Sequence, residues 1–222
     1  MGHHAALLGL FGGWLAYAAL HSLLAAHAVK ACISRRWPAA MRYYRLAYNV
    51  IATLFLLPLL WATYALPGEP LWRWSGSGAW IANLLAVAAL AGIWRASRAY
   101  DMAAFLGLQA WRAQVGEDGA LRLSALHRYV RHPWYSLGLL LIWTRDMNAP
   151  FLVSALAVTL YLIVGARLEE KKLLARFGDV YRDYMQRVPG LIPLPGKRLS
   201  AAEAEALMRR SMERTGHRQD KL

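Results

Sequence analysis

The sequence predicts an all-α protein of the polytopic membrane class, a helical bundle of about five transmembrane helices with interfacial helices on the cytoplasmic side. Hydrophobic residues make up 58% and charged residues 18% of the 222 residues, whereas soluble domains hold roughly 45–50% and about 25%. The apolar residues also gather in long runs with few charges. A soluble globule, a disordered chain and a coiled coil therefore fit poorly. The length allows one domain or at most two small ones.

Five apolar runs are the predicted transmembrane helices, because a helix needs about 20 mostly apolar residues to cross a bilayer core of about 30 Å. Pro58 is expected to kink the second run. The fourth run is short for a full span, and only four residues separate it from the fifth, which predicts a tight hairpin. The runs cover residues 5–26, 46–66, 78–94, 133–144 and 149–166.

The basic residues predict how these helices are oriented. Of the 26 Lys and Arg residues, 24 lie in alternate connections or in the C-terminal part, which leaves Arg73 and Arg145 on the opposite side. The positive-inside rule then places the N-terminus outside and the C-terminus in the cytoplasm, in a bacterial inner membrane. The net charge of +13 is explained by this topology, so membrane lipids are expected as partners and nucleic acid is not.

The remaining organisation is simple. We expect one transmembrane domain over residues 1–195 and a basic cytoplasmic tail over 196–222, which starts with a short helix capped by Ser200. Cys32 is the single cysteine of the chain, which excludes an internal disulfide and a cysteine-based metal cluster. No metal site is predicted.

One candidate site surrounds Arg131-His132-Pro133. Pro133 is suited to be the first residue of a helix, because its missing N–H would be unpaired there. His132 should then lie at the cap, since a residue before proline avoids the helical region. The N-terminus of a helix favours a carboxylate or a phosphate, and Gly138 would allow a backbone or a flat ligand to approach. A basic helix start at the level of the lipid headgroups is the other interpretation.

A second candidate site is the acidic pair Glu169-Glu170 after the last apolar run. Adjacent carboxylates at a membrane boundary are costly unless they are paired or functional. The other interpretation is an interfacial amphipathic helix, with both carboxylates paired to Lys or Arg three or four residues away. At helical spacing, one acidic side chain and four apolar or aromatic ones share a stripe. They are Glu170, Leu174, Phe177, Tyr181 and Tyr184.

Together these segments resemble the C-terminal signature of integral-membrane methyltransferases, which include isoprenylcysteine carboxyl methyltransferases and phospholipid N-methyltransferases. The resemblance covers roughly residues 120–195, and Trp134 departs from the aliphatic residue more usual there. The matching motifs are Arg131-His132-Pro133-x-Tyr135-x-x-Gly138, Arg167-x-Glu169-Glu170, Phe177-Gly178-x-x-Tyr181-x-x-Tyr184 and Val188-Pro189-x-x-Ile192-Pro193.

The resemblance implies S-adenosylmethionine as cofactor, bound from the cytosolic side. The residues that it assigns to the cofactor are Tyr129, Val130, Arg131, His132, Pro133, Tyr135, Gly138, Glu169 and Glu170. Two further motifs in the N-terminal half resemble those of NnrU-type and methanethiol S-methyltransferase-like members of the family. These motifs are His21-Ser22-Leu23-Leu24-Ala25 and Arg42-x-x-Arg45-Leu46-x-Tyr48-Asn49.

The predicted function is methyl transfer to a small or lipophilic acceptor, a thiol or an isoprenylcysteine carboxylate. Arg45, Asn49 and Arg167 are the candidate catalytic residues, the first two because they share a helix face and could neutralise an anionic acceptor. Polar groups near the inner helix ends could instead satisfy one another or anchor lipid phosphates. Two alternative functions remain open: an NADPH-dependent membrane reductase of related architecture, and a non-enzymatic accessory protein of a respiratory complex.

Overall fold

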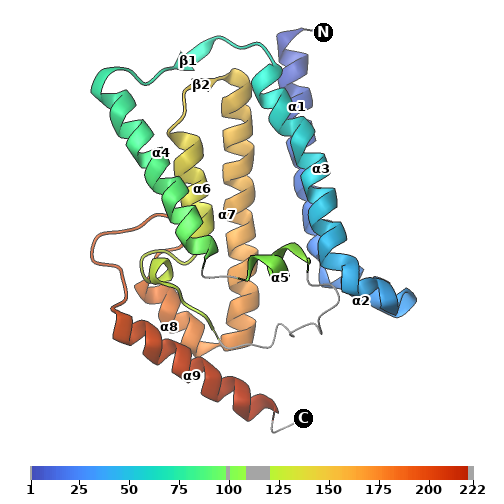
Figure 1. The fold of residues 1–222 in the computed structure, drawn as a ribbon, viewed down its shortest axis with the longest axis vertical. Coiled ribbons are helices and arrows are strands. Elements are labelled where there is room, and N and C mark those ends of the chain that lie inside the picture. Colours follow the sequence, from blue (N-terminus) through green and yellow to red (C-terminus); the bar gives the residue numbers. More distant parts are fainter. Residues whose placement is uncertain (1, 99–100, 109–120, 220–222) are drawn as a thin grey trace. The chain divides into compact units, whose positions relative to one another are not determined.

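A computed structural model describes residues 2–98, 101–108 and 121–219, and this part of the chain is almost entirely helical (Figure 1). The α-helices are α1 (His3–Ala25), α2 (His27–Arg36), α3 (Tyr44–Ala65), α4 (Gly76–Ser97), α5 (Met102–Leu106), α6 (Pro133–Trp143), α7 (Ala149–Phe177), α8 (Asp179–Arg187) and α9 (Ala201–Gln219). Two 3₁₀ turns, Pro38–Tyr43 and Ala125–Arg128, and two short strands, β1 (Pro70–Trp72) and β2 (Met147–Asn148), complete the described elements.

Four helical segments are long and apolar enough to cross a membrane, which confirms the predicted all-α membrane class. Large apolar side chains point outward along them, for example Leu8 at 71% and Leu84 at 69% exposure, as a lipid-facing surface requires. The predicted span at 133–144 is α6, whose 11 residues reach only about 17 Å. The four long segments are His4–Ala25, Pro38–Ala65, Gly76–Ser97 and Ala149–Phe177.

The chain forms two compact units, to each of which α4, α6 and α7 contribute a part. Unit 1 comprises Met1–Leu84, Tyr100–Gln114 and Ile142–Tyr161, and unit 2 comprises Leu85–Ala99, Val115–Leu141 and Leu162–Leu222. The boundary expected between a domain over 1–195 and a tail over 196–222 stays a prediction.

In unit 1, α1 and α3 pack side by side along their length (Figure 1). A buried polar link fixes α7 to both of them: the Trp14 indole donates to Ser154 Oγ over 2.8 Å, and the Thr63 hydroxyl lies 2.6 Å from the same oxygen. Such small hydroxyl residues commonly join helices inside membranes. Strand β1 pairs antiparallel with β2 where α7 begins.

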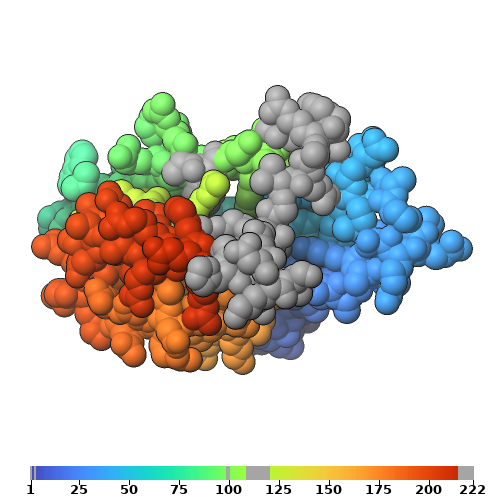
Figure 2. Space-filling model, turned by 90° about the horizontal axis from the view of Figure 1, so that it is seen from below, coloured from blue at the N-terminus to red at the C-terminus, as the bar shows by residue number. Residues whose placement is uncertain are grey.

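The core of unit 2 joins the end of α7 to α8 and α9. The predicted aromatic stripe supplies part of it, since Phe177, Tyr181 and Tyr184 are all buried there. The helix nevertheless breaks at Gly178, so the stripe is divided between α7 and α8. Helices α8 and α9 lie side by side, and Figure 2 shows them on one face of this unit.

Helix α9 starts as the sequence predicts. The Glu203 amide donates to Ser200 Oγ over 3.2 Å, and the Ser200 amide donates to Glu203 Oε2 over 2.7 Å, which is a capping box. The helix is longer than expected, because it runs for 19 residues. Its Ala204 and Leu207 are buried in the core of unit 2 and Ser211 is also buried, so tertiary packing stabilises the first turns of the helix.

Candidate functional site

The site in unit 2 is built on the start of α6. Pro133 is its first helical residue, and the His132 carbonyl accepts a hydrogen bond from the Ser136 amide over 3.0 Å, so His132 lies at the cap as predicted. The amides of Arg131 and His132 donate to the carbonyls of Pro189 and Gly190 over 2.9 and 3.1 Å. The segment that follows α8 therefore fixes the backbone of both residues.

Glu170 on α7 lies at the centre of the site. Arg131 donates to its Oε1 from Nε over 2.8 Å and from Nη2 over 2.7 Å, and His132 Nε2 lies 3.0 Å from the same oxygen. The side chains of Arg131 and Glu170 are only 11% and 12% exposed. These partners lie almost forty positions away in the sequence, so the structure does not show the alternative interpretation, in which Glu170 pairs with a basic residue three or four positions away.

Glu169 takes a different position beside the same histidine. Its Oε2 lies 3.5 Å from His132 Nδ1 and accepts from the Tyr135 hydroxyl over 3.3 Å, while half of its side chain is exposed. The rings of His132 and Tyr135 are stacked, with their centroids 5.4 Å apart. We call Arg131, His132, Tyr135, Glu169 and Glu170 the carboxylate cluster.

Several supporting contacts were not predicted from the sequence. Arg131 Nη1 also donates to the carbonyls of Met185, over 3.1 Å, and Val188. The Ser136 hydroxyl donates to the Leu191 carbonyl over 2.6 Å, and the Tyr184 hydroxyl donates to the His127 carbonyl over 2.6 Å. The Val188-Pro189 motif was the available signal, but a motif does not say which carbonyls a buried guanidinium will reach.

The other predicted cofactor residues are close in sequence to the members of the carboxylate cluster. Val130 and Pro133 are buried, whereas Tyr129 is 41% exposed. A Cβ at Gly138 would meet no atom within 4 Å, so among the described residues no backbone packs there and the space beside it is open. Arg167 is exposed on α7.

The two predicted acceptor residues of the N-terminal half lie in unit 1. Arg45 Nη1 donates to the Ala104 carbonyl over 3.2 Å, and Asn49 Nδ2 donates to the Phe105 carbonyl over 3.1 Å. Both carbonyls belong to α5, so these side chains satisfy groups at the end of a short helix.

His21 forms a second polar group in unit 1, on α1. Its Nε2 lies 2.6 Å from the Tyr48 hydroxyl and its Nδ1 lies 2.5 Å from the Tyr161 hydroxyl. Polar side chains from α1, α3 and α7 thus satisfy one another, which is the packing alternative that the sequence left open.

His132 of the carboxylate cluster and the nearby His127 have opposite pKa shifts. The pKa of His127 is lowered to about 4, chiefly by burial and also by the positive charge of His132, against the opposing charge of Glu169. Burial also acts to lower the pKa of His132, but hydrogen bonds and negative charge from Glu169 and Glu170 outweigh it, so the pKa is raised. His127 is therefore neutral at pH 7, and His132 protonates more readily than an ordinary histidine.

We expect His127→Gln to make the protein less sensitive to acid. Because the folded pKa is about 4 and the ordinary value is 6.5, the unfolded chain takes up a proton first as the pH falls. The stability that neutral His127 contributes is full above pH 6.5 and is lost between pH 6.5 and 4, by roughly 3 kcal/mol at most. Glutamine keeps the capping box in which the Ser124 amide donates to His127 Nδ1.

The measurement is the thermal unfolding midpoint of both proteins at pH 7.5 and pH 4.5. The parent should lose more stability on acidification than His127→Gln does. His132 contributes stability with the opposite pH dependence, because its raised pKa stabilises the fold at low pH and this stability is lost as the pH rises. Both proteins contain His132, so its contribution cancels in the comparison. Equal losses in the two proteins would contradict the assignment of a depressed pKa to His127.

Known proteins are similar to this sequence over most of its length. The chain is 34% identical over 184 residues to methanethiol S-methyltransferase 2 of Bradyrhizobium diazoefficiens, which covers 80% of this chain and 69% of that protein. It is 33% identical over 189 residues to methanethiol S-methyltransferase of Pseudomonas sp. GM41, with the same two coverages. The identity to the Mycobacterium tuberculosis protein of that name is 30% over 203 residues, which covers 85% of this chain and 76% of that one.

No protein-family model matches the chain, and no solved structure matches it. The relatives confirm the resemblance drawn from the spaced motifs, and they favour neither the reductase nor the accessory protein of a respiratory complex. With four membrane-length helices and relatives of this one name over most of its length, the chain belongs to the integral-membrane methyltransferase family that contains the methanethiol S-methyltransferases, and it is a methyltransferase.

Proposed function

We propose that this enzyme transfers a methyl group from S-adenosylmethionine to the sulfur of a small or lipophilic thiol, and that the carboxylate cluster holds the methyl donor. The observation that carries the proposal is that the two adjacent carboxylates differ in burial and in partners. Glu170 is largely buried, forms an ion pair with Arg131 and lies 3.0 Å from His132 Nε2. Glu169 keeps half of its side chain exposed beside the stacked rings of His132 and Tyr135.

The chemistry of these side chains suits the proposed donor, which carries an ammonium, a carboxylate, two ribose hydroxyls and a sulfonium. Glu169 can accept hydrogen bonds from the ammonium or the hydroxyls. The partly exposed ring of Tyr129, over which the Arg128 guanidinium lies at 5.9 Å, is of a kind that binds cations, and the start of α6 favours a carboxylate. Val130 and Pro133 support this start, and the open space at Gly138 leaves room for a ligand beside α6.

When bound, the donor supplies a methyl group on a positively charged sulfur. A bond forms from the acceptor sulfur to the methyl carbon as the carbon–sulfonium bond breaks, which yields a thioether and S-adenosylhomocysteine, and the thiol proton leaves to water. The chain contributes by holding the donor in line and by excluding water from the reacting atoms. Glu170 serves this task indirectly, because it fixes Arg131 and His132.

The acceptor is proposed from the relatives and from the composition of the first helices. The relatives are named for methanethiol, a small apolar thiol. Apolar helices desolvate such an acceptor at little cost, whereas a large polar acceptor would lose hydration worth several kcal/mol. Arg45, Asn49 and Arg167 remain the candidates to stabilise the acceptor thiolate, and an isoprenylcysteine carboxylate is the next substrate to test.

The topology belongs to the same proposal. Because 24 of the 26 basic residues follow the alternating pattern, we place the N-terminus outside and the C-terminus in the cytoplasm of a bacterial inner membrane. The residues over 1–195 would then form the transmembrane enzyme and those over 196–222 its cytoplasmic tail. A cysteine introduced beside Gly76, at the exposed Ser77, in a Cys32→Ser background should react with an impermeant reagent from outside only. Reaction from the cytoplasmic side would reverse the orientation.

The decisive experiment uses the purified full chain in lipid nanodiscs. Methyl-labelled S-adenosylmethionine is supplied with methanethiol, with farnesylcysteine or with an amine lipid, and each product is identified by its mass. Labelled dimethyl sulfide should form, and S-adenosylhomocysteine should bind in calorimetry while NADPH should not. Binding of NADPH without S-adenosylhomocysteine would overturn the proposed donor, and methylation of the amine lipid alone would overturn the thiol.

A further inference from the structure

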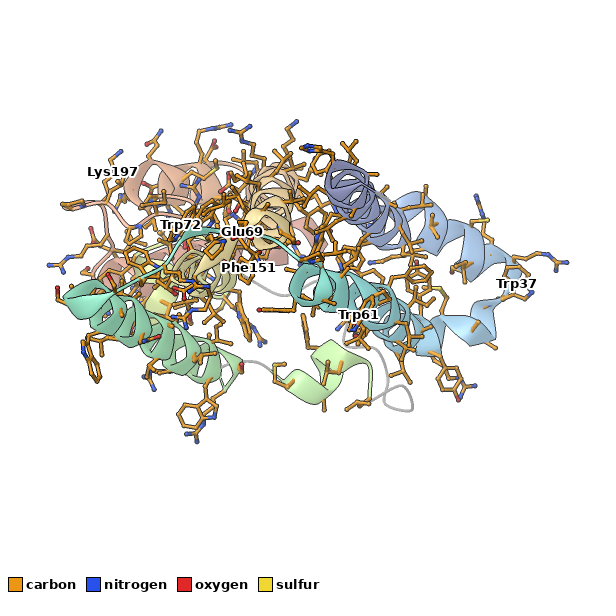
Figure 3. The ribbon with its side chains drawn as sticks, turned by 90° about the horizontal axis from the view of Figure 1, so that it is seen from above. Trp37, Trp61, Glu69, Trp72, Phe151 and Lys197 are labelled. Carbon is orange, nitrogen blue, oxygen red and sulfur yellow. The ribbon has the colours of Figure 1, made fainter. Side chains whose placement is uncertain are left out.

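A second site lies in unit 1, in a cavity of about 640 Å³. Its volume lies within the range of small-molecule sites, roughly 300–1,000 Å³. Figure 3 looks onto this end of the unit, in which Glu69, Trp72 and Phe151 are labelled. The cavity is lined by residues from the end of α3, the β1 segment, the first turns of α4 and the connection between α6 and α7, with Arg73, Asn83, Thr144, Arg145, Asp146 and Phe151 among them.

Arg145 enters this cavity with its hydrogen bonding incomplete. Its Nη1 donates to Asn83 Oδ1 and its Nη2 to the Ala82 carbonyl, both at the long distance of 3.3 Å. Its Nε is buried and has no hydrogen-bond partner among the described residues. A buried N–H of a charged group is costly when it is unpaired, so the protein does not fully satisfy this guanidinium, although Nε itself has no surface open to the cavity.

The positive charge in the cavity is only partly compensated. Arg73 lines the same cavity, and within the described part of the chain neither arginine has a carboxylate within the 4.0 Å of an ion pair. The carboxylate of Asp146 is the acidic group of the lining, and its Oδ1 accepts from the Trp74 amide over 3.0 Å. Two guanidinium groups and a single carboxylate therefore line the cavity, which gives its lining a net positive charge.

The positions of these two arginines need a local explanation. They are the two basic residues that depart from the alternating pattern of the other 24. The positive-inside rule disfavours arginine there, yet both exceptions line the same cavity. A guanidinium at such a place is explained by an anion that it binds, and its flat fork of donors fits the oxygens of a phosphate.

The surroundings place this anion at the level of the lipid headgroups. Large aromatic side chains are exposed on the same ends of α3, β1 and α4, as in the aromatic belts of membrane interfaces. Phosphate esters are the abundant anions at that level. These exposed side chains are Trp61, Tyr64, Trp72, Trp74 and Trp80.

We propose that this cavity is a phosphate-binding site, in which Arg73 and Arg145 contact the phosphate of a membrane phospholipid headgroup or phosphate taken up from solution. The site is separate from the carboxylate cluster, which belongs to unit 2. It does not depend on the identity of the methyl donor or of the acceptor.

The test uses the delipidated full chain in detergent and the variants Arg73→Gln and Arg145→Gln. The matched control is Arg209→Gln, which removes one positive charge from an exposed position of α9. The probes are dioctanoyl phosphatidylglycerol, dioctanoylglycerol, which has the same chains without phosphate, and inorganic phosphate. Bound probe is counted by native mass spectrometry, and thermal unfolding follows its effect on the fold.

The parent and Arg209→Gln should bind phosphatidylglycerol and unfold at a higher temperature with it, whereas both cavity variants should bind it at least tenfold more weakly. The same dependence on Arg73 and Arg145 with inorganic phosphate as with the lipid would assign the site to dissolved phosphate. Arg73 is exposed, so Arg73→Gln keeps the test valid if Arg145→Gln fails to fold. Equal binding by the parent and the cavity variants, or by the lipid without phosphate, would overturn the proposal.

Discussion

Glu170→Gln is expected to lower the free energy of unfolding by about 3–5 kcal/mol, the usual effect of removing one partner of a buried ion pair. Arg131 would remain buried at 11% exposure without its carboxylate. His132 Nε2 would lose the negative charge of the oxygen that lies 3.0 Å away. Because both residues shape the start of α6, the variant should also lose affinity for S-adenosylhomocysteine.

The neighbouring residue supplies a matched control. Glu169→Gln makes the same chemical change one position earlier, at a side chain that is half exposed, so we expect a loss of stability below about 1 kcal/mol. If Glu169 contacts the methyl donor, binding should weaken by roughly 1.5–3 kcal/mol, about tenfold to a hundredfold.

Chemical unfolding in micelles and calorimetric titration with S-adenosylhomocysteine measure the two effects separately. Binding by Glu169→Gln within about twofold of the parent would reject the assignment of the carboxylate cluster to the donor. Unchanged stability of Glu170→Gln would instead show that the buried pair with Arg131 does not support the fold.

The sequence predicted the components of this site better than their connections. Pro133 at the start of a helix and His132 at its cap follow from local rules that act on adjacent residues. The pairing of Glu170 with Arg131 does not, because it joins two segments that only the fold brings together. Helical spacing suggested that Glu170 pairs with a lysine or arginine on its own helix. In the fold, Glu170 and Arg131 are both largely buried, and Arg131 donates two hydrogen bonds to the carboxylate.

The helix boundaries show the same division between local and tertiary causes. The apolar runs located the long helices, since hydrophobic length alone selects them. The last apolar run was predicted to end at residue 166, and the structure continues it without a break as α7 to Phe177. The pairing of Glu170 and the burial of Phe177 stabilise turns that hydropathy would place outside the membrane.

Helix α5 was not predicted at all, because five residues are too short to show a period. Hydrogen bonds and backbone geometry at its two ends stabilise it. The Ala104 amide donates to Asp101 Oδ1 over 3.0 Å at its start, and Gly107 ends it in the left-handed region at φ +79°. Its last carbonyls accept from Arg45 and Asn49. The hydrogen bonds of the candidate acceptor residues Arg45 and Asn49 therefore depend on α5, and α5 can pack against α3 only because residue 107 has no Cβ.

We therefore expect Gly107→Ala to be strongly destabilising, for two reasons that can be separated. An alanine in the left-handed region costs about 1–2 kcal/mol. The added Cβ would also lie 2.5 Å from the Leu46 amide nitrogen and 2.9 Å from the Arg45 carbonyl carbon, and neither backbone atom can rotate away as a side chain would. Because α5 must then move from α3, the bonds from Arg45 and Asn49 should weaken, and the total should reach roughly 3 kcal/mol or more.

Gly196→Ala isolates the first cause from the second. Gly196 has nearly the same φ, +76°, but a Cβ there would meet nothing within 4 Å. We expect this variant to lose only the 1–2 kcal/mol of the backbone conformation. Unfolding of both variants in the same micelles gives the difference, which is the cost of forcing α5 from α3. Equal losses would show that α5 does not pack closely on the residues around Arg45, and Gly107→Ala should then keep full turnover for each folded molecule.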